Sequence, residues 1–324
     1  MGGEPAARQP VRVAVRCRPA HSSDGEPCVT ILNKGTISVH SGDEEASFTF
    51  DACFGSTVVQ HDVYSELVAS PMASLFDGYN CTILAYGQTG SGKTYSMMGA
   101  SDESMPPADR ARAAGIIPRF GAELFERVAA VPGAKVVVSY VQLHNEVFSD
   151  LLEPASKAEL RLRRSEARGI HIQGLCEKRV TSAKELLHLL ARADTGRITA
   201  ATRLNAASSR SHAILTLALT IPKGARGGGK AVTSRANLVD LAGSEKYNDA
   251  GGSAQRKQES IAINQSLTTL GLVISTLAQV SSWHATSCST RHRTACATMH
   301  SPTWCRTCHL APQPTASRLA ACGT

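Results

Sequence analysis

One eight-residue stretch combines glycines, a lysine and a threonine at a spacing that suits phosphate binding. It fits G-x-x-x-x-G-K-[ST], in which glycines let backbone N–H groups face a polyphosphate, while Lys93 reaches the β- and γ-phosphates and Thr94 binds Mg²⁺. The apolar run at 81–86 predicts the strand that leads into such a loop. A chance glycine-rich turn is the alternative, and the loop alone does not separate a kinase, a GTPase or a motor. The stretch consists of Gly87, Gln88, Thr89, Gly90, Ser91, Gly92, Lys93 and Thr94.

An aspartate follows a second apolar run, at residues 237–239. P-loop enzymes need a carboxylate at the end of such a strand to hold Mg²⁺, so Asp240 is the candidate. Behind it, Gly243 could bring a backbone N–H to the γ-phosphate, and Glu245 adds a carboxylate a few residues away. By itself this stretch also fits a tight turn after a strand.

Residues 205–212 place hydroxyl groups and an arginine directly before an apolar strand. The hydroxyls of Ser208 and Ser209 can bind Mg²⁺ or phosphate oxygens, and Arg210 can form a forked pair with a carboxylate. A polar turn or a helix end is the alternative for this stretch.

Together these stretches resemble the kinesin motor domain. The resemblance rests on the run Arg16-Cys17-Arg18-Pro19, on the loop at 87–94, on N-x-x-S-S-R-S-H at 205–212 and on D-L-A-G-S-E at 240–245. The segment 263–271 also resembles the switch II helix of that family. Because four motifs occur in family order, chance is negligible, and related motors such as myosins use a different loop sequence.

The resemblance assigns a role to each of these residues. The adenine side of the pocket is lined by Arg16, Arg18 and Pro19, with Tyr95 as a stacking neighbour. Switch I contains Asn205, Ser208, Ser209 and Arg210, and switch II contains Asp240, Gly243 and Glu245. The metal ligands are Thr94, Ser209 and Asp240, and the catalytic group is Lys93, Ser209, Arg210, Gly243 and Glu245. Arg210 is expected to pair with Glu245 when the pocket closes.

The function that the resemblance implies is a microtubule-based motor driven by hydrolysis of ATP with Mg²⁺. Microtubules are then the partner, and the basic residues Lys246, Arg256 and Lys257 are candidates to face their acidic surface. Gln142 and His144 stand where the family has glutamate and tyrosine, a change expected to affect a microtubule-proximal strand and not the pocket. Two alternatives stay open: a non-motile, truncated isoform that binds nucleotide or microtubules, and a nonfunctional truncated product.

The elements that must position these residues alternate between helix and strand. Such alternation predicts an α/β fold of the P-loop NTPase class, with a mostly parallel central sheet and helices on both faces. The apolar stripe from Ile263 to Leu277 has helical spacing and is expected to be core. Pro71 is expected to kink or restart its helix. The expected strands are 11–16, 48–50, 81–86, 135–143, 212–221 and 230–240, and the expected helices are 59–76, 117–129, one beginning near 182, and 263–277.

Composition sets wider limits on the chain. The length of 324 residues suits one large α/β domain or two ordinary ones, and the net charge of +7 suits an acidic partner. We find no 20-residue apolar stretch and no secretory leader, so the sequence predicts a soluble intracellular protein. The resemblance implies that it acts in the cytoplasm on the cytoskeleton, without inserting into a membrane or binding nucleic acid. Oligomeric state stays open, and the scattered cysteines predict a disulfide-free protein.

The resemblance ends near residue 282. We expect a disordered N-terminus at 1–10, an incomplete motor domain at 11–282, and a tail at 283–324 that is disordered or aberrant. The tail contains five of the ten cysteines and neither lysine nor acid, which favours an altered reading frame, and its C-x-x-C-H run at 305–309 follows from composition. In the family the last central strand lies between the first strand and the P-loop strand. Unless the tail fills that place, an unstable chain is predicted.

Overall fold

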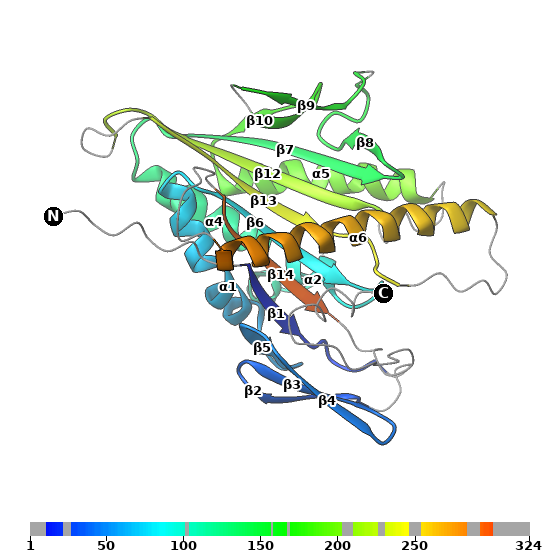
Figure 1. Cartoon of the computed structure of the whole chain (residues 1–324). Coiled ribbons are helices and arrows are strands. Elements are labelled where there is room, and N and C mark those ends of the chain that lie inside the picture. Colours follow the sequence, from blue (N-terminus) through cyan, green and yellow to red (C-terminus); the bar gives the residue numbers. More distant parts are fainter. Residues whose placement is uncertain are drawn as a thin grey trace.

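A mixed β-sheet forms the centre of the computed structural model, which describes residues 11–21, 27–100, 104–156, 158–166, 169–202, 210–225, 231–245, 254–283 and 292–300. Within these ranges the main sheet has nine strands in the order β11-β7-β12-β13-β6-β14-β1-β5, with β8 paired to β7 (Figure 1). The strands are β1 (Arg12–Arg16), β5 (Ala52–Phe54), β6 (Asn80–Gly87), β7 (Lys135–His144), β8 (Val147–Asp150), β11 (Lys178–Val180), β12 (His212–Ile221), β13 (Val232–Asp240) and β14 (His292–His300).

The two halves of this sheet differ in strand direction. β6 pairs in parallel with β13 and β14, and β1 pairs in parallel with β14 and β5. On the other side, β12 pairs antiparallel with both β13 and β7. The predicted fold class is confirmed, and its parallel half is the half that contains the P-loop strand.

Two small sheets lie outside the main one. β2 (Val29–Asn33), β3 (Thr36–Ser41) and β4 (Glu44–Thr49) form a three-stranded antiparallel sheet. β9 (Arg161–Ser165) and β10 (Gly169–Gln173) form a two-stranded antiparallel sheet at the opposite end of the molecule (Figure 1).

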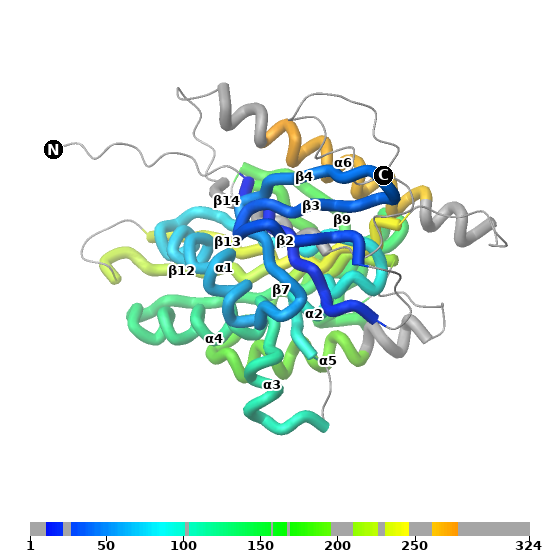
Figure 2. Tube along the Cα trace, turned by 90° about the horizontal axis from the view of Figure 1, so that it is seen from below, coloured from blue at the N-terminus to red at the C-terminus, as the bar shows by residue number. Residues whose placement is uncertain are grey.

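Helices cover both faces of the main sheet. α6 lies on one side and α4 and α5 lie on the other (Figure 2), where α4 also packs against α1. The helices are α1 (Gln60–Phe76), α2 (Lys93–Met97), α3 (Pro107–Ala113), α4 (Ile116–Ala129), α5 (Ala183–Thr202) and α6 (Ala254–Trp283). α1 continues through the buried Pro71, so the helix does not restart there.

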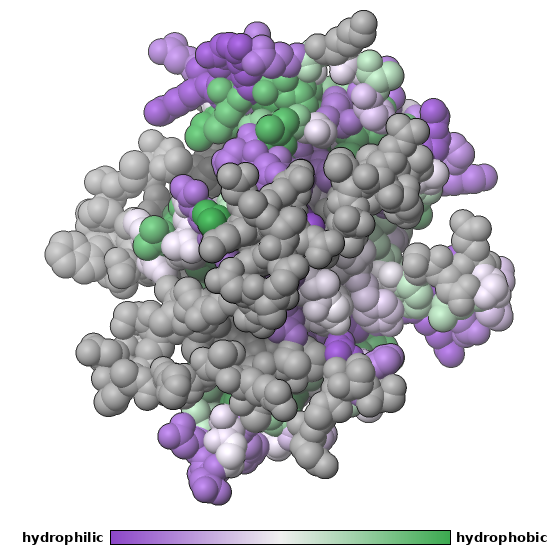
Figure 3. Space-filling view, turned by 90° about the vertical axis from the view of Figure 1, so that its right-hand side faces the viewer, coloured by the Kyte–Doolittle hydropathy of each residue, from purple (hydrophilic) through white to green (hydrophobic). Residues whose placement is uncertain are grey.

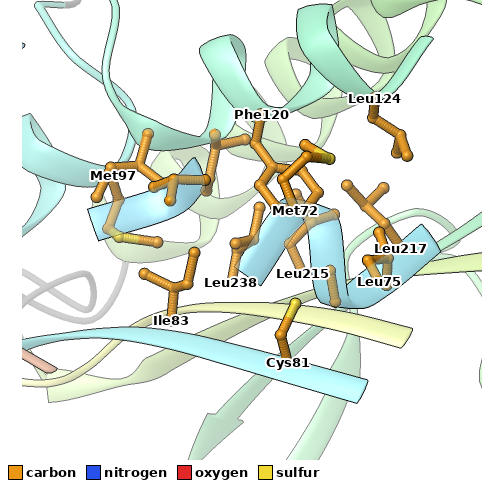
Figure 4. Close-up of a cluster of buried hydrophobic side chains, with 14 of the residues drawn as sticks. Met72, Leu75, Cys81, Ile83, Met97, Phe120, Leu124, Leu215, Leu217 and Leu238 are labelled. Carbon is orange, nitrogen blue, oxygen red and sulfur yellow. The ribbon is translucent and has the colours of Figure 1, made fainter. Parts of the chain in front are cut away.

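The larger core lies between the sheet and the α1, α4 and α5 layer. Met72 and Leu75 of α1 meet Phe120 of α4 above the sheet residues Ile83 and Leu215 (Figure 4), and each of these side chains is almost fully buried. Burying a side chain of this size contributes roughly 1.5–3 kcal/mol relative to leaving it exposed. This core holds β6, and therefore the loop that follows it, in place.

A smaller apolar cluster lies under α6. Leu84, Val239 and Leu241 pack there against Ile263 and Leu267. The predicted core stripe of this helix is therefore correct in its first half only, because Leu277 is 49% exposed.

β14 corrects the expectation for the tail. Residues 292–300 occupy the position between β6 and β1, pairing from Arg12↔Cys296 to Val15↔Met299 on one side and up to His300↔Gly87 on the other. Backbone N–H and C=O groups of the two neighbours can pair with a strand of almost any sequence, which explains why this strand lacks a clear side-chain pattern. Residues 1–10 and 301–324 lie outside the described part of the chain.

Candidate nucleotide-binding site

The P-loop connects the end of β6 to the start of α2. Gly90 and Gly92 have φ angles of 77° and 100°, left-handed values that a side chain would strain. The buried Lys93 donates from Nζ to the carbonyl oxygens of Gly87 (2.8 Å) and Gln88 (2.9 Å). Burial lowers the pKa of Lys93, while Asp240 and Glu245 act in the opposite direction. The loop therefore keeps an ammonium group against its own concave backbone.

Two of the predicted metal ligands lie in contact. The Thr94 hydroxyl donates to Oδ2 of Asp240 at 2.6 Å, which joins the start of α2 to the end of β13. Hydroxyl and carboxylate oxygens are ligands that Mg²⁺ accepts. The third predicted ligand, Ser209, lies outside the described residues, as do Asn205 and Ser208.

The environment of Ser91 indicates whether the loop suits a phosphate group. Its hydroxyl is buried and has no hydrogen-bond partner among the described residues, and the same residue lines the adjoining cleft. A buried hydroxyl without a partner is costly, and a phosphate oxygen would accept its hydrogen bond. The residues present therefore fit a nucleotide phosphate.

Glu245 contacts the P-loop directly. Its two carboxylate oxygens accept hydrogen bonds from the Thr89 N–H at 2.8 Å and from the Thr89 hydroxyl at 2.6 Å. Gly243 makes this possible, because a Cβ atom there would overlap both the Glu245 carboxylate and the Thr89 hydroxyl. The Arg210–Glu245 ion pair expected when the pocket closes does not occur among the described residues, where Glu245 contacts Thr89 instead.

A cleft of about 350 Å³ adjoins the P-loop on the side of β1. Tyr95 is 44% exposed, and the Arg16 guanidinium lies 5.3 Å from the centre of its ring. An exposed aromatic ring beside a cleft of this volume can stack on a planar base. The cleft is lined by Arg16, Cys17, Arg18, Pro19, Ser56, Val58, Ser91, Gly92, Tyr95 and Ser96.

Arg16 forms the inner wall of this cleft. Its guanidinium is buried and donates to Gln60 Oε1 at 2.9 Å and to Ser96 Oγ at 2.8 Å. Burial lowers the pKa of Arg16 from its ordinary value. Gln60 in turn donates to the backbone oxygen of Tyr95 at 2.7 Å. Sequence reasoning missed Gln60, because one polar residue at the start of an apolar helix carries no pattern.

His212 is a second residue to which the sequence assigned no role. It is only 7% exposed and lies at the start of β12, between the loop after β13 and helix α6. The signal was present, because His212 closes the N-x-x-S-S-R-S-H stretch. Burial, reinforced by the nearby Lys93, lowers the pKa of His212 to about 4, so the imidazole is neutral at physiological pH.

Gln142 reaches the switch I stretch. Its side-chain amide donates to the hydroxyl of the fully buried Ser211 at 2.7 Å. Neither Gln142 nor Ser211 lines the cleft beside the P-loop, so the expectation that this departure does not affect the pocket stays a prediction. An uncharged amide at this position contributes a donor where a glutamate would contribute only acceptors.

A family model described as the kinesin motor domain matches residues 16–291. This chain belongs to the kinesin motor family. It is 37% identical over 281 residues to the kinesin heavy chain of Gibberella moniliformis, covering 85% of this chain and 29% of that protein. It is also 37% identical over 306 residues to Kinesin-related protein 1 of Dictyostelium discoideum, covering 84% of this chain and 13% of that protein. The chain thus spans less than a third of the length of these curated relatives.

A solved kinesin structure supports the same family. The structure titled "Structure of a fast kinesin: Implications for ATPase mechanism and interactions with microtubules" matches with a TM-score of 0.73 and 31% identity. The match covers 89% of this chain and 84% of the other. The resemblance drawn from the sequence motifs and the kinesin motor fold are both confirmed.

Within the described part of this kinesin domain, no helix has the length and apolar character needed to cross a bilayer. The predicted site residues that are described form two groups. Lys93, Thr94, Asp240, Gly243 and Glu245 meet around the P-loop, and Arg16, Arg18, Pro19 and Tyr95 line the cleft beside it. Arg210 lies apart, near His212 and the α6 residues Ile263 and Ser266.

Proposed function

We propose that this kinesin motor domain hydrolyses ATP with Mg²⁺ and couples hydrolysis to binding and movement along microtubules in the cytoplasm. The observation that carries the proposal is the contact between Thr94 and Asp240 beside the buried Lys93. It brings a lysine and a hydroxyl from the start of α2 together with a carboxylate from β13 at the end of the parallel strands, where nucleotides bind in open α/β sheets.

Each described residue has a role in this proposal. Tyr95, with Arg16, Arg18 and Pro19, holds the adenine base in the cleft, and Lys93 places its positive charge at the phosphates. Thr94 and Asp240, together with Ser209, hold Mg²⁺, which when bound neutralises charge that develops on the phosphoryl oxygens. Gly243 and Glu245 lie in the loop after β13 and respond to the γ-phosphate. Arg210 and Glu245 pair as that loop closes.

The partner that we propose is the microtubule, and not nucleic acid or a membrane. Arg161, Arg163 and Arg164 are exposed on β9. Figure 3 shows hydrophilic side chains beside a hydrophobic patch at the upper end of the molecule, where Figure 1 places β9 and β10. Leu162 of β9 and Ile170 of β10 are exposed apolar side chains. A basic surface attracts an acidic protein surface, and exposed apolar residues within it are typical of a protein–protein interaction site.

The test is phosphate release by the 324-residue chain with Mg·ATP, with and without polymerised microtubules. We expect stimulation by microtubules, and we expect Lys93→Ala to lower both rates about 100-fold or more, because an electrostatic contact to the reacting phosphate is lost. Lys34→Ala is the matched control, since Lys34 is exposed and distant in sequence from the loop. Turnover without stimulation would support a nucleotide-binding isoform instead, and no turnover from folded protein would overturn the proposal.

A further inference from the structure

His212 connects the loop after β13, which lies beside the nucleotide site, to helix α6. Its Nδ1 accepts a hydrogen bond from the Ala242 N–H at 3.0 Å, one residue before Gly243. Its Nε2 lies 2.9 Å from the hydroxyl of Ser266 on α6. One imidazole therefore connects the loop after β13 to the helix that covers it.

The hydrogen-bond pattern determines the tautomer of this ring. The Ser266 hydroxyl donates its hydrogen to the Ile263 carbonyl at 2.7 Å, so towards His212 it can only accept. Nε2 must then carry the hydrogen, and Nδ1 is left as the acceptor that the Ala242 N–H requires. Every polar atom of the bridge has a partner only while the imidazole is neutral.

One side of the bridge is apolar, whereas the other borders a small pocket that is also lined by Glu146 and Arg210. Leu241 and Ala242 on the loop pack against Ile263 and Leu267 of α6, and all four are buried. In such surroundings a hydrogen bond is stronger than in water and a lost partner is more costly. The bridge is therefore suited to resist relative movement of the loop and the helix.

We propose that His212 is a positioning residue that makes the loop after β13 and helix α6 shift together. This inference rests on the proposed function, in which Gly243 and Glu245 respond to the γ-phosphate. A displacement of the loop is passed through Ala242, the imidazole and Ser266 to α6. His212 contacts neither the phosphate-binding loop nor its predicted metal ligands in any hydrogen bond of the described residues, so its role is to transmit movement.

Three variants separate the two ends of the bridge. His212→Asn keeps an acceptor near the position of Nδ1 but is too short to reach Ser266. His212→Gln keeps a donor near the position of Nε2 but loses the acceptor for Ala242. Ser266→Ala removes the far end and leaves the histidine in place. Thr268→Ala is the matched control, because its hydroxyl also bonds a helix carbonyl, that of Asn264, and is exposed.

The first measurement is amide hydrogen exchange of residues 241–245 in the full chain, read by mass spectrometry. Ser266→Ala and His212→Asn should each speed exchange there about fivefold, a factor in the range of one lost neutral hydrogen bond, although Ser266 does not touch the loop. His212→Gln should speed it further, and Thr268→Ala should not change it. The double variant His212→Asn with Ser266→Ala should match either single variant, because both break the same contact.

The second measurement is phosphate release at saturating Mg·ATP as microtubules are added. Ser266→Ala and His212→Asn should lower the stimulated rate about fivefold while the KM for ATP stays within about twofold, which separates coupling from nucleotide binding. A wild-type chain without microtubule stimulation would overturn the proposed function, and the exchange experiment would still decide the role of His212. Exchange in Ser266→Ala equal to that in Thr268→Ala, or additive effects in the double variant, would overturn the inference.

Discussion

At the scale of single residues, the site depends on buried polar groups that each connect two elements. Arg16 connects β1 to α1 and to α2, and Thr94 connects α2 to β13. His212 connects the loop after β13 to α6. Because each bridge is buried, loss of one partner leaves a polar atom without compensation, a larger cost than the net value of the bond itself.

Because the pKa of His212 is lowered in the folded protein, we expect the free energy of unfolding to decrease in acid. The folded protein binds a proton there only near pH 4, whereas the unfolded chain does so near the ordinary value of 6.5. The stabilising contribution is therefore present above about pH 6.5 and is lost as the pH falls towards 4. Between pH 7 and pH 5 the free energy of unfolding of the wild type should fall about 2 kcal/mol more than that of His212→Gln.

Urea unfolding at the two pH values measures this difference. His212→Gln will be less stable than the wild type at pH 7, because it loses the Ala242 contact, so the informative quantity is the change with pH in each protein. His171→Gln is the control, since His171 lies on β10 and its Nδ1 is 3.0 Å from the Gly169 carbonyl oxygen, a contact that does not involve the loop after β13 or α6. Equal acid sensitivity in the wild type and His212→Gln would show that His212 is not held neutral in the fold.

At the residue scale, the sequence supports a site prediction where a motif has the residue types and spacing that a known chemistry requires. The loop at 87–94 and Asp240 could be assigned because their residue types and spacing are dictated by phosphate and Mg²⁺. Gln60 could not, since its partner Arg16 is 44 residues away and no local pattern links them. The engagement of Glu245 by Thr89, across 156 residues, was missed for the same reason.

At the scale of elements, the periodicity of apolar residues was sufficient to predict a helix or strand where one face of that element is buried. The strands β6, β7 and β12 lie within a few residues of the predicted positions, because alternation follows burial. The helix predicted at 263–277 lies inside α6, which extends beyond it at both ends. β14 was not predicted, because its order comes from backbone pairing with β1 and β6. The sheet of β2, β3 and β4 was foreseen only at residues 48–50, since short, partly exposed strands show weak alternation.

Ser182 caps the N-terminus of α5. Ser182 Oγ accepts the Glu185 N–H at 3.2 Å, while the Glu185 carboxylate reaches the Thr181 N–H and not that of Ser182, as a standard capping box would. Ser182→Ala removes the cap and should lower the free energy of unfolding by about 1 kcal/mol in urea titrations. Ser182→Thr keeps the oxygen and should stay close to the wild type; an equal loss in both variants would argue against capping.

At the scale of the whole molecule, β14 closes the sheet. It is the strand that joins β6, which leads into the P-loop, to β1, whose end lines the cleft. The P-loop and the β1 side of the cleft therefore lie on opposite sides of β14 in the sheet. Their relative position depends on a strand whose residues show no pattern of their own.

A chain that ends at residue 291 tests this dependence, with a chain that ends at residue 300 as its matched control. Without β14, the facing edges of β1 and β6 keep backbone groups unpaired in the middle of the sheet, so cooperative folding should be lost. The chain of 300 residues keeps all described elements and should unfold in one transition near the midpoint of the full chain, followed by circular dichroism during heating. If the 291-residue chain unfolds cooperatively at that same midpoint, β1 and β6 do not need β14, and the two halves of the nucleotide site are held together by α1 and the surrounding core instead.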